Sequence, residues 1–267
     1  MKTKITFIAL IFASLFTFTD VQAQAQRCGI VNTAFAPGER IEYDLFFTMG
    51  IVRARAGRGS ITIEESTFRG QPAYRARMTV GTTGAANVIQ SFTETSTSFL
   101  DKSFRPLQYS RETHERSHIV ETIDFTHSGN QTNIRTVRYI NDEQRFDYSF
   151  TADACTFDNF SILLFVRNMD FSSMNVGDRK HVQFVTGRRL SNMYINFLGT
   201  STMRINGNRQ EVYNISMTIF EEAFTNPNDA ISASITRDAN RIPVEINTHL
   251  RVGAVRMVMR NASGLRH

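Results

Sequence analysis

Tryptophan is absent from this chain of 267 residues, and cysteine occurs only twice. The 15 glycines and 5 prolines are too few for a collagen or a low-complexity linker. No apolar run reaches the length of about 18 residues that a membrane-spanning helix needs. Hydrophobic residues make up 41% of the chain and charged residues 21%. This composition is typical of an ordinary globular domain, so the sequence excludes fibrous, disordered and helical membrane proteins.

The first 23 residues have the features of a signal peptide. A basic start precedes the apolar stretch 5–18, which has the length of a signal-peptide core. Small side chains then predict cleavage between Ala23 and Gln24, which leaves a mature chain of 244 residues. Loss of two lysines and one aspartate lowers the net charge from +5 to +4. We therefore expect an exported protein, in the periplasm or at the cell surface of a bacterium, without a transmembrane segment in the mature chain.

Export favours a disulfide between Cys28 and Cys155, because oxidising compartments allow such bonds to persist. A bond across a loop of this length stabilises the fold by about 4–5 kcal/mol in the chain-entropy model. It would tether the segment 24–39 to a single antiparallel domain over 40–267. Two independent buried thiols are the alternative.

Lysine is nearly absent from the mature chain, which contains 26 arginines but only Lys102 and Lys180. Arginine binds carboxylate, phosphate or sulfate with a planar fork that lysine lacks. An anionic glycan or a lipid head group is therefore a conceivable partner. Nucleic acid is disfavoured, because the chain is predicted to be exported and its arginines form no dense basic run.

Alternation of apolar and polar residues predicts β-strands along most of the chain from residue 40 onward. Around 60–80, apolar and charge pairing predicts a hairpin whose register is set by three cross-strand pairs. These pairs are Ile61 with Met78, Ile63 with Ala76 and Glu64 with Arg75. Further hairpins are expected at the turns Asn141-Asp142-Glu143 and Asn206-Gly207-Asn208.

One segment departs from this pattern. Apolar residues recur at intervals of three and four near 157–169, which predicts a helix, with Thr156 as its N-cap. The predicted fold is therefore mainly β: a strongly curved antiparallel sheet or an open half-barrel, with one principal helix packed against it.

The segment His114-Glu115-Arg116-Ser117-His118 matches the H-E-x-x-H pattern of zinc hydrolases. On a helix, side chains four residues apart lie about 5–6 Å from one another and can share a metal ion. Along a single strand the same spacing separates them by roughly 13 Å. The flanking residues alternate as strands do, so we predict a hairpin tip, and a zinc hydrolase using His114, Glu115 and His118 is the less favoured alternative.

Other catalytic patterns are missing from the sequence: there is no glycine-rich phosphate loop and no G-x-S-x-G serine motif. No cofactor is implied. Arg53 with Arg55, and Arg75 with Arg77, each share one strand face and are weak candidates for binding an anionic ligand. A solvated face with cross-strand partners such as Glu64 is the favoured interpretation of these arginines.

Several short phrases, in this order, resemble an uncharacterised exported bacterial family, the domain of unknown function 3108. They are Cys28-Gly29-Ile30, Phe35-Ala36-Pro37-Gly38-Glu39, Ile41-Glu42-Tyr43-Asp44, Phe104-Arg105-Pro106-Leu107, Cys155-Thr156-Phe157-Asp158-Asn159-Phe160-Ser161, Arg167-Asn168-Met169-Asp170, Phe197-Leu198-Gly199 and Asp238-Ala239-Asn240-Arg241-Ile242-Pro243-Val244. The resemblance implies an exported, mostly antiparallel β protein and supports the pairing of Cys28 with Cys155. It implies no catalytic residue and no ligand.

Taken together, these observations predict an exported, non-enzymatic protein of the cell envelope. The inward phenylalanine, isoleucine and valine side chains of a curved sheet could bind an apolar or amphipathic ligand, such as a lipid or glycolipid, on its concave face. A structural or assembly factor of the envelope is a further alternative. The sequence leaves the oligomeric state and any protein partner open.

Overall fold

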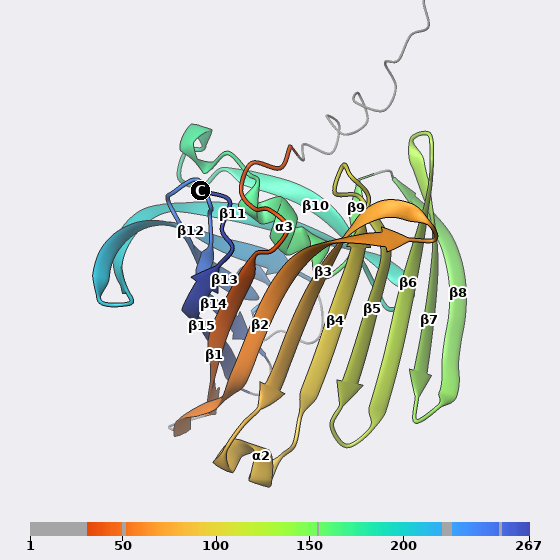
Figure 1. Ribbon diagram of the computed structural model, residues 1–267, viewed down its shortest axis with the longest axis horizontal. Coiled ribbons are helices and arrows are strands. Elements are labelled where there is room, and N and C mark those ends of the chain that lie inside the picture. Colours follow the sequence, from red (N-terminus) through yellow and green to blue (C-terminus); the bar gives the residue numbers. More distant parts are fainter. Residues whose placement is uncertain (1–30, 50–51, 154, 221–225, 251–252) are drawn as a thin grey trace, which may run out of the picture.

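The computed structural model describes residues 31–49, 52–153, 155–220, 226–250 and 253–267 (Figure 1). The predicted cleavage site between Ala23 and Gln24 lies outside these residues, as does Cys28. Cys155 is described and is half-buried just before a short strand. Signal-peptide cleavage and the pairing of Cys28 with Cys155 therefore stay predictions.

Fifteen strands of the described residues form one sheet. They are β1 (Arg40–Met49), β2 (Val52–Phe68), β3 (Gln71–Thr82), β4 (Thr93–Leu100), β5 (Pro106–His114), β6 (His118–Ser128), β7 (Gln131–Ile140), β8 (Glu143–Asp153), β9 (Thr156–Phe157), β10 (Arg179–Thr186), β11 (Arg189–Ile205), β12 (Asn208–Ile219), β13 (Ile231–Thr236), β14 (Pro243–His249) and β15 (Ala254–Ser263). The helical segments are α2 (Ala85–Ile89), α3 (Ser161–Arg167), η1 (Phe171–Ser173) and η2 (Pro227–Asp229).

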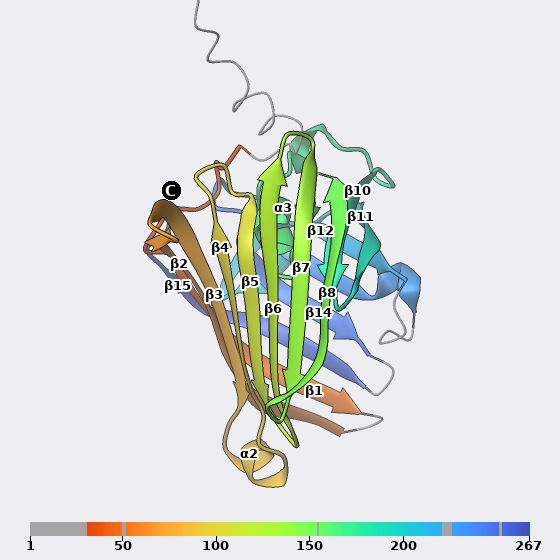
Figure 2. The ribbon, with the colours of Figure 1, turned by 90° about the vertical axis from the view of Figure 1, so that its right-hand side faces the viewer.

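The strand order is simple: β8 to β1 follow one another, β1 pairs with β15, and β15 to β9 complete the sheet. Neighbouring strands are antiparallel except β9 and β10, which are parallel. The sheet curls so that β2 to β8 form one wall and β10 to β13 face them (Figures 1 and 2). This nearly closed, barrel-like sheet confirms the predicted fold class. Its two edges, β8 and β9, are neighbours in the sequence.

Side-chain alternation determines which face of each strand is buried. Ile41 and Tyr43 on β1 are almost fully buried, as the alternation of this segment predicts. The predicted register of the β2–β3 hairpin is also confirmed. Its pairs are Ile61 with Met78, Ile63 with Ala76 and Glu64 with Arg75. A shift of one residue would turn the buried isoleucines to the outside, and this explains why the pattern specifies the register so well.

The two predicted asparagine turns are also present. Asn141 and Asp142 both have positive φ angles, of 51° and 64°, and connect β7 to β8. Asn206 and Gly207 have φ angles of 48° and 86° and connect β11 to β12. Two consecutive residues with positive φ angles form a tight turn whose twist matches that of the flanking strands.

Helix α3 is shorter than the predicted helix over 157–169, and Thr156 is not its N-cap. Thr156 instead belongs to β9, where its backbone takes part in the parallel pairing with β10. Asp158 takes the capping role, because its Oδ1 atom accepts hydrogen bonds of 2.7 Å from the backbone N–H groups of Phe160 and Ser161. A carboxylate at this place satisfies N–H groups that the helix itself leaves unpaired.

Helix α3 lies inside the curve of the sheet, between the wall formed by β4 to β8 and the strands β10 to β12 (Figure 2). Six of its seven residues are buried. Its apolar side chains join the main hydrophobic core together with residues from both walls. The predicted principal helix is therefore an internal element of the barrel.

The last residue of α3, Arg167, is buried and is held by the loops at this end of the barrel. Its guanidinium donates to both carboxylate oxygens of Glu39, over 2.5 and 2.9 Å. It also donates to the backbone oxygens of Asn240 and Arg241, over 2.8 and 3.1 Å. The side chains of Arg167 and Glu39 are only 1% and 0% exposed. This pair therefore fixes α3 to the start of β1 and to the loop between β13 and β14.

We expect Arg167→Met to reduce the free energy of unfolding by about 3–5 kcal/mol, because it leaves the carboxylate of Glu39 buried without a partner. Urea unfolding followed by circular dichroism measures this loss. The double variant Arg167→Met/Glu39→Met removes both charges and should recover part of the stability.

The matched control is Arg256→Met, which breaks the 2.6 Å ion pair with Glu245 on the surface. The side chain of Arg256 is 52% exposed, so this change should cost less than about 1 kcal/mol. Equal losses for Arg167→Met and Arg256→Met would contradict the structural role assigned to Arg167.

Candidate functional site

A cavity of about 440 Å³ lies inside the barrel, between α3 and the strands β10 to β15. From α3, the side chains of Ile162, Leu163 and Val166 line it. The sheet contributes mostly isoleucine, phenylalanine and methionine, the methionines being Met78, Met193, Met217 and Met257. Methionine is flexible and adapts to irregular apolar partners. The volume is within the usual range for small-molecule sites.

Polar groups are sparse in the wall of this cavity. Among the described residues that line it, Asn159 and Thr186 supply the polar side chains. Asn159 lies just before α3, and Thr186 is the last residue of β10. The cavity therefore suits a hydrocarbon group.

A buried aspartate positions the start of α3 beside this cavity. Ser98 on β4 donates a 2.7 Å hydrogen bond to Oδ2 of Asp158, and its Oδ1 accepts from the backbone of Phe160 and Ser161. Burial raises the pKa of Asp158, although these hydrogen bonds oppose the shift. Because Asn159 and Phe160 line the cavity, Asp158 is a positioning residue for its wall.

The opposite part of the interior is charged. Glu121 on β6, whose side chain is 3% exposed, accepts hydrogen bonds from Arg111 on β5 and Arg138 on β7, over 3.0 and 2.6 Å. Arg111 also lies 3.8 Å from Glu94 on β4. Buried charges require partners of this kind. The interior of the barrel therefore has an apolar side next to α3 and an ionic side on β4 to β7.

The predicted hairpin tip is present, but it brings the two histidines together. His114 ends β5 and His118 begins β6, directly opposite one another. Their rings are stacked with centroids 4.3 Å apart. The separation expected along one strand does not apply, because the chain reverses between the two residues. Glu112 lies beside both imidazoles, whereas Glu115 forms a hydrogen bond with Gln90.

Three of the four arginines considered as anion ligands have described side chains, and each of the three contacts a different residue. Arg75 pairs with Glu64 over 2.5 Å, which is the cross-strand partner predicted from the sequence. Arg55 pairs with Asp44. Arg77 makes a long contact of 3.5 Å with Thr97. The side chain of Arg53 lies outside the described parts of the chain. The ion pairs of Arg55 and Arg75 fit a solvated face better than an anion-binding site.

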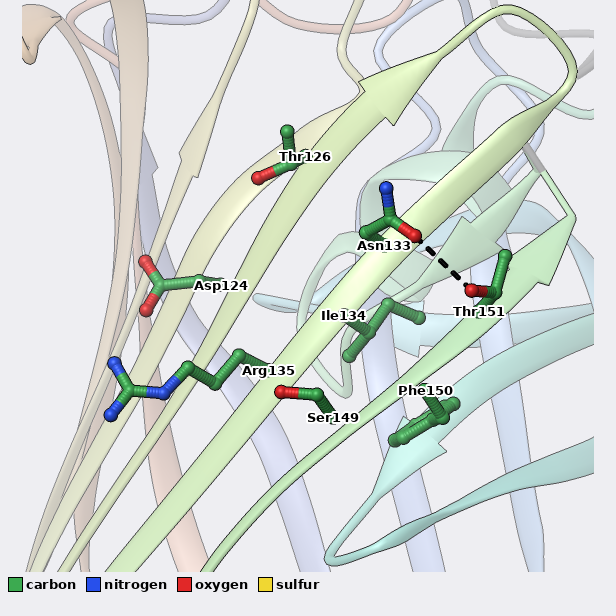
Figure 3. A pocket seen from close by; sticks show the side chains of 8 residues that line it. All are labelled: Asp124, Thr126, Asn133, Ile134, Arg135, Ser149, Phe150 and Thr151. Atoms are coloured by element: carbon green, nitrogen blue, oxygen red, sulfur yellow. Dashed lines mark hydrogen bonds between the residues drawn. The ribbon is translucent and has the colours of Figure 1, made fainter.

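A hollow of about 370 Å³ lies on β6 to β8 (Figure 3). Thr151 donates a 3.1 Å hydrogen bond to Asn133 at one end of it. Its charged groups already have partners. Asp124 accepts from Arg69 over 2.9 Å, and Arg135 donates to Asp147 over 2.5 Å. This hollow is a weaker candidate than the internal cavity.

The family model described as "Protein of unknown function (DUF3108)" matches residues 42–260. The chain belongs to the DUF3108 family. No curated protein matches it. Among the described residues of this DUF3108 protein, no helix has the length and apolar character needed to cross a membrane.

Two solved structures that match this DUF3108 protein share very little sequence with it. The beta-barrel-like protein of domain of unknown function DUF1849 from Brucella abortus has 8% identity and a TM-score of 0.57, covering 87% of this chain and 99% of that chain. A protein with a YmcC-like fold from Bacteroides fragilis, named as exported, has 10% identity and a TM-score of 0.30, covering 86% and 97%. The similarity to the Brucella protein shows the fold alone.

Three of the phrases that suggested DUF3108 from the sequence meet at one end of the barrel. Glu39 and Arg167, from two of these phrases, form the buried ion pair, and a third phrase contributes the backbone oxygen of Asn240. Asn168 accepts a 2.8 Å hydrogen bond from the backbone N–H of Thr33. The recognisable segments therefore include those that hold α3 in place.

Sequence reasoning missed the residues of the internal cavity. Its wall comes from α3 and from several strands far apart in the chain, and its side chains are those of any hydrophobic core. The only available signal was the high content of inward apolar residues, which suited a core and a pocket equally. Only the three-dimensional arrangement distinguishes the two.

We expect the stability of Asp158→Asn relative to the natural protein to increase with pH. The raised pKa means that ionising Asp158 in the folded state is unfavourable. This cost is absent below the ordinary pKa of aspartate and grows as pH rises through the raised value. Asparagine stays neutral and keeps an oxygen for the backbone N–H groups. Unfolding midpoints in urea between pH 4 and pH 8 measure the difference.

Asp147→Asn is a control of opposite sign. Hydrogen bonding to Arg135 lowers the pKa of Asp147, so its ionised form stabilises the folded state. The stability of Asp147→Asn relative to the natural protein should therefore fall as pH rises from the lowered pKa to the ordinary pKa of aspartate, so unfolding midpoints for this variant are also measured below pH 4. The same trend for both variants would contradict the assignment of Asp158 as a carboxyl disfavoured by burial.

Proposed function

We propose that this DUF3108 protein is an exported, non-enzymatic protein of the cell envelope that binds an apolar or amphipathic ligand, such as a lipid or glycolipid. The observation that carries this proposal is the apolar cavity of about 440 Å³ inside the barrel. Each buried methylene group of an acyl chain contributes about 0.8 kcal/mol to binding. A hydrocarbon chain therefore gains more from this cavity than a polar molecule does.

The composition of the cavity also supports a binding role over catalysis. Its polar side chains, Asn159 and Thr186, are neither acids, bases nor strong nucleophiles in their ordinary states. Zinc hydrolysis by His114, Glu115 and His118 has less support, since these residues lie at a hairpin tip and Glu115 contacts Gln90. A role as an assembly factor predicts a stable protein partner that crosslinking in cells would capture.

We expect Ala233→Phe to weaken ligand binding by about tenfold or more, because it places a ring in the apolar cavity, where Ala233 lines the wall. The measurement is a fluorescence titration of the mature protein with cis-parinaric acid. Native mass spectrometry of protein purified from its own host shows whether a lipid is already bound. Ala233→Leu is a smaller change of the same kind if the phenylalanine variant does not fold.

Ser232→Phe is the matched control, because it adds the same ring to the neighbouring residue, on the opposite face of β13. It should bind the probe as the natural protein does. The proposal is wrong if the protein neither binds the probe nor copurifies with a ligand. Equal weakening by Ala233→Phe and Ser232→Phe would show that the probe binds elsewhere.

A further inference from the structure

A second cavity, of about 870 Å³, lies where the turn between β10 and β11 approaches β7 and β8. We name it the arginine cleft, since Arg138, Arg145, Arg188 and Arg189 line it. β8 is one edge of the sheet, and β10 lies next to the other edge, β9. The cleft is thus located at the seam where the barrel does not close by strand pairing.

Side chains hold the two sides of this seam together. The guanidinium groups of Arg138 and Arg188 both lie over the ring of Phe146 on β8, at 5.1 and 5.6 Å from its centroid. Gly187 in the β10–β11 turn approaches Arg138. Cation–π contacts of this kind are weak to moderate in energy. Nε and Nη2 of Arg138 already donate to Glu121, so Arg188 is the member of this pair whose guanidinium edge can bind a ligand.

The charge of the cleft is positive. Arg138 pairs with Glu121 over 2.6 Å, and Arg145 pairs with Glu143 over 3.0 Å. Arg188 is exposed and, within the described residues, forms no ion pair with a carboxylate. Arg188 therefore contributes a positive charge to the cleft that no described carboxylate balances. Arginine forks bind phosphate, sulfate and carboxylate groups with two hydrogen bonds at once.

Thr186 lines both the arginine cleft and the apolar cavity. Thr186, at the end of β10, therefore borders both spaces, one positive and open at the seam, the other apolar and inside the barrel. We infer that the ligand is an anionic amphiphile, with its acidic head group in the arginine cleft and its hydrocarbon chain in the apolar cavity. This inference rests on the function proposed above and adds the charge of the ligand.

The test compares two probes with the same hydrocarbon chain, cis-parinaric acid, which has a charged carboxylate, and its methyl ester, which is neutral and one methyl group larger. The natural protein should bind the acid at least about tenfold more tightly, since a charge-assisted hydrogen bond is worth about 1.5–3 kcal/mol. Arg188→Gln should remove most of this preference and leave binding of the ester unchanged. Raising the salt concentration should weaken binding of the acid alone.

Arg209→Gln is the control, because Arg209 is an exposed arginine at the start of β12, outside the residues that line the cleft. It should keep the preference for the acid. Equal binding of acid and ester by the natural protein would overturn the inference and leave the proposed function standing. Failure of both probes to bind would count against the proposed function itself. Loss of the preference in Arg209→Gln as well would place the anion contact outside the cleft.

A separate observation concerns the tip of the β5–β6 hairpin. The Nε2 atoms of His114 and His118 lie 3.1 and 2.9 Å from the same carboxylate oxygen of Glu112. One ligand atom of each of the three residues lies within 4.8 Å of the others. Ligand atoms of a tetrahedral zinc site are separated by about 3.3 Å, given zinc–ligand distances of about 2.0–2.1 Å. The distances from the two Nε2 atoms to the Glu112 oxygen are therefore close to the separation of ligand atoms in a zinc site.

We propose that Glu112, His114 and His118 bind a divalent cation, of which Zn²⁺ fits the nitrogen and oxygen ligands best. The site differs from the sequence motif, because Glu112 replaces Glu115 and the histidines come from two strands. It also revises the expectation of no metal.

Isothermal titration of the tag-free mature protein with zinc chloride tests this site. One zinc ion should bind, and both His118→Ala and Glu112→Gln should weaken binding at least about tenfold, the loss expected for one ligand of a three-ligand site. Glu115→Gln is the control within the same tip and should change nothing. The proposal is overturned if zinc does not bind, or if it binds equally well to His118→Ala.

Discussion

The ion pair between Arg167 and Glu39 is the constraint on which the interior of this protein depends. A curved sheet can enclose a helix only if the polar ends of that helix find partners away from water. At the end of α3, the side chains of Asn168 and Arg241 donate to the backbone oxygens of Leu164 and Arg167. The guanidinium of Arg167 contacts Glu39 and the loop between β13 and β14. The pair thereby connects the first strand, the internal helix and the C-terminal strands.

The interior is divided by polarity, and this division follows from the strand sequences. On β4 to β7 the inward positions include Glu94, Arg111, Glu121 and Arg138, which satisfy one another. On β10 to β15 the inward positions are almost entirely apolar. An amphipathic molecule that lay across this division would have each of its parts in a suitable environment. The division thus supports a ligand with two chemically different ends.

Much of the fold could be predicted from the sequence, because alternation reports burial residue by residue. Ile61 and Ile63 must face inward together, and this fixed the register of β2 and β3. Other features depend on contacts that no local pattern encodes. Arg188 and Phe146 meet across the seam without strand pairing, and the cavity wall combines distant strands. The stacking of His114 and His118 likewise depends on the exact position of the turn between β5 and β6.

The two ends of α3 determine how a ligand could reach the cavity. Asp158 and Ser98 fix the beginning of the helix to β4, and Arg167 fixes its end. Displacing the helix would expose these buried polar groups without partners, which is costly. At the seam, by contrast, Arg188 of the β10–β11 turn contacts Phe146 of the edge strand β8 through side chains, without strand pairing. Side chains rearrange far more easily than a strand pair or a buried helix, so the seam is the less costly route to the apolar cavity.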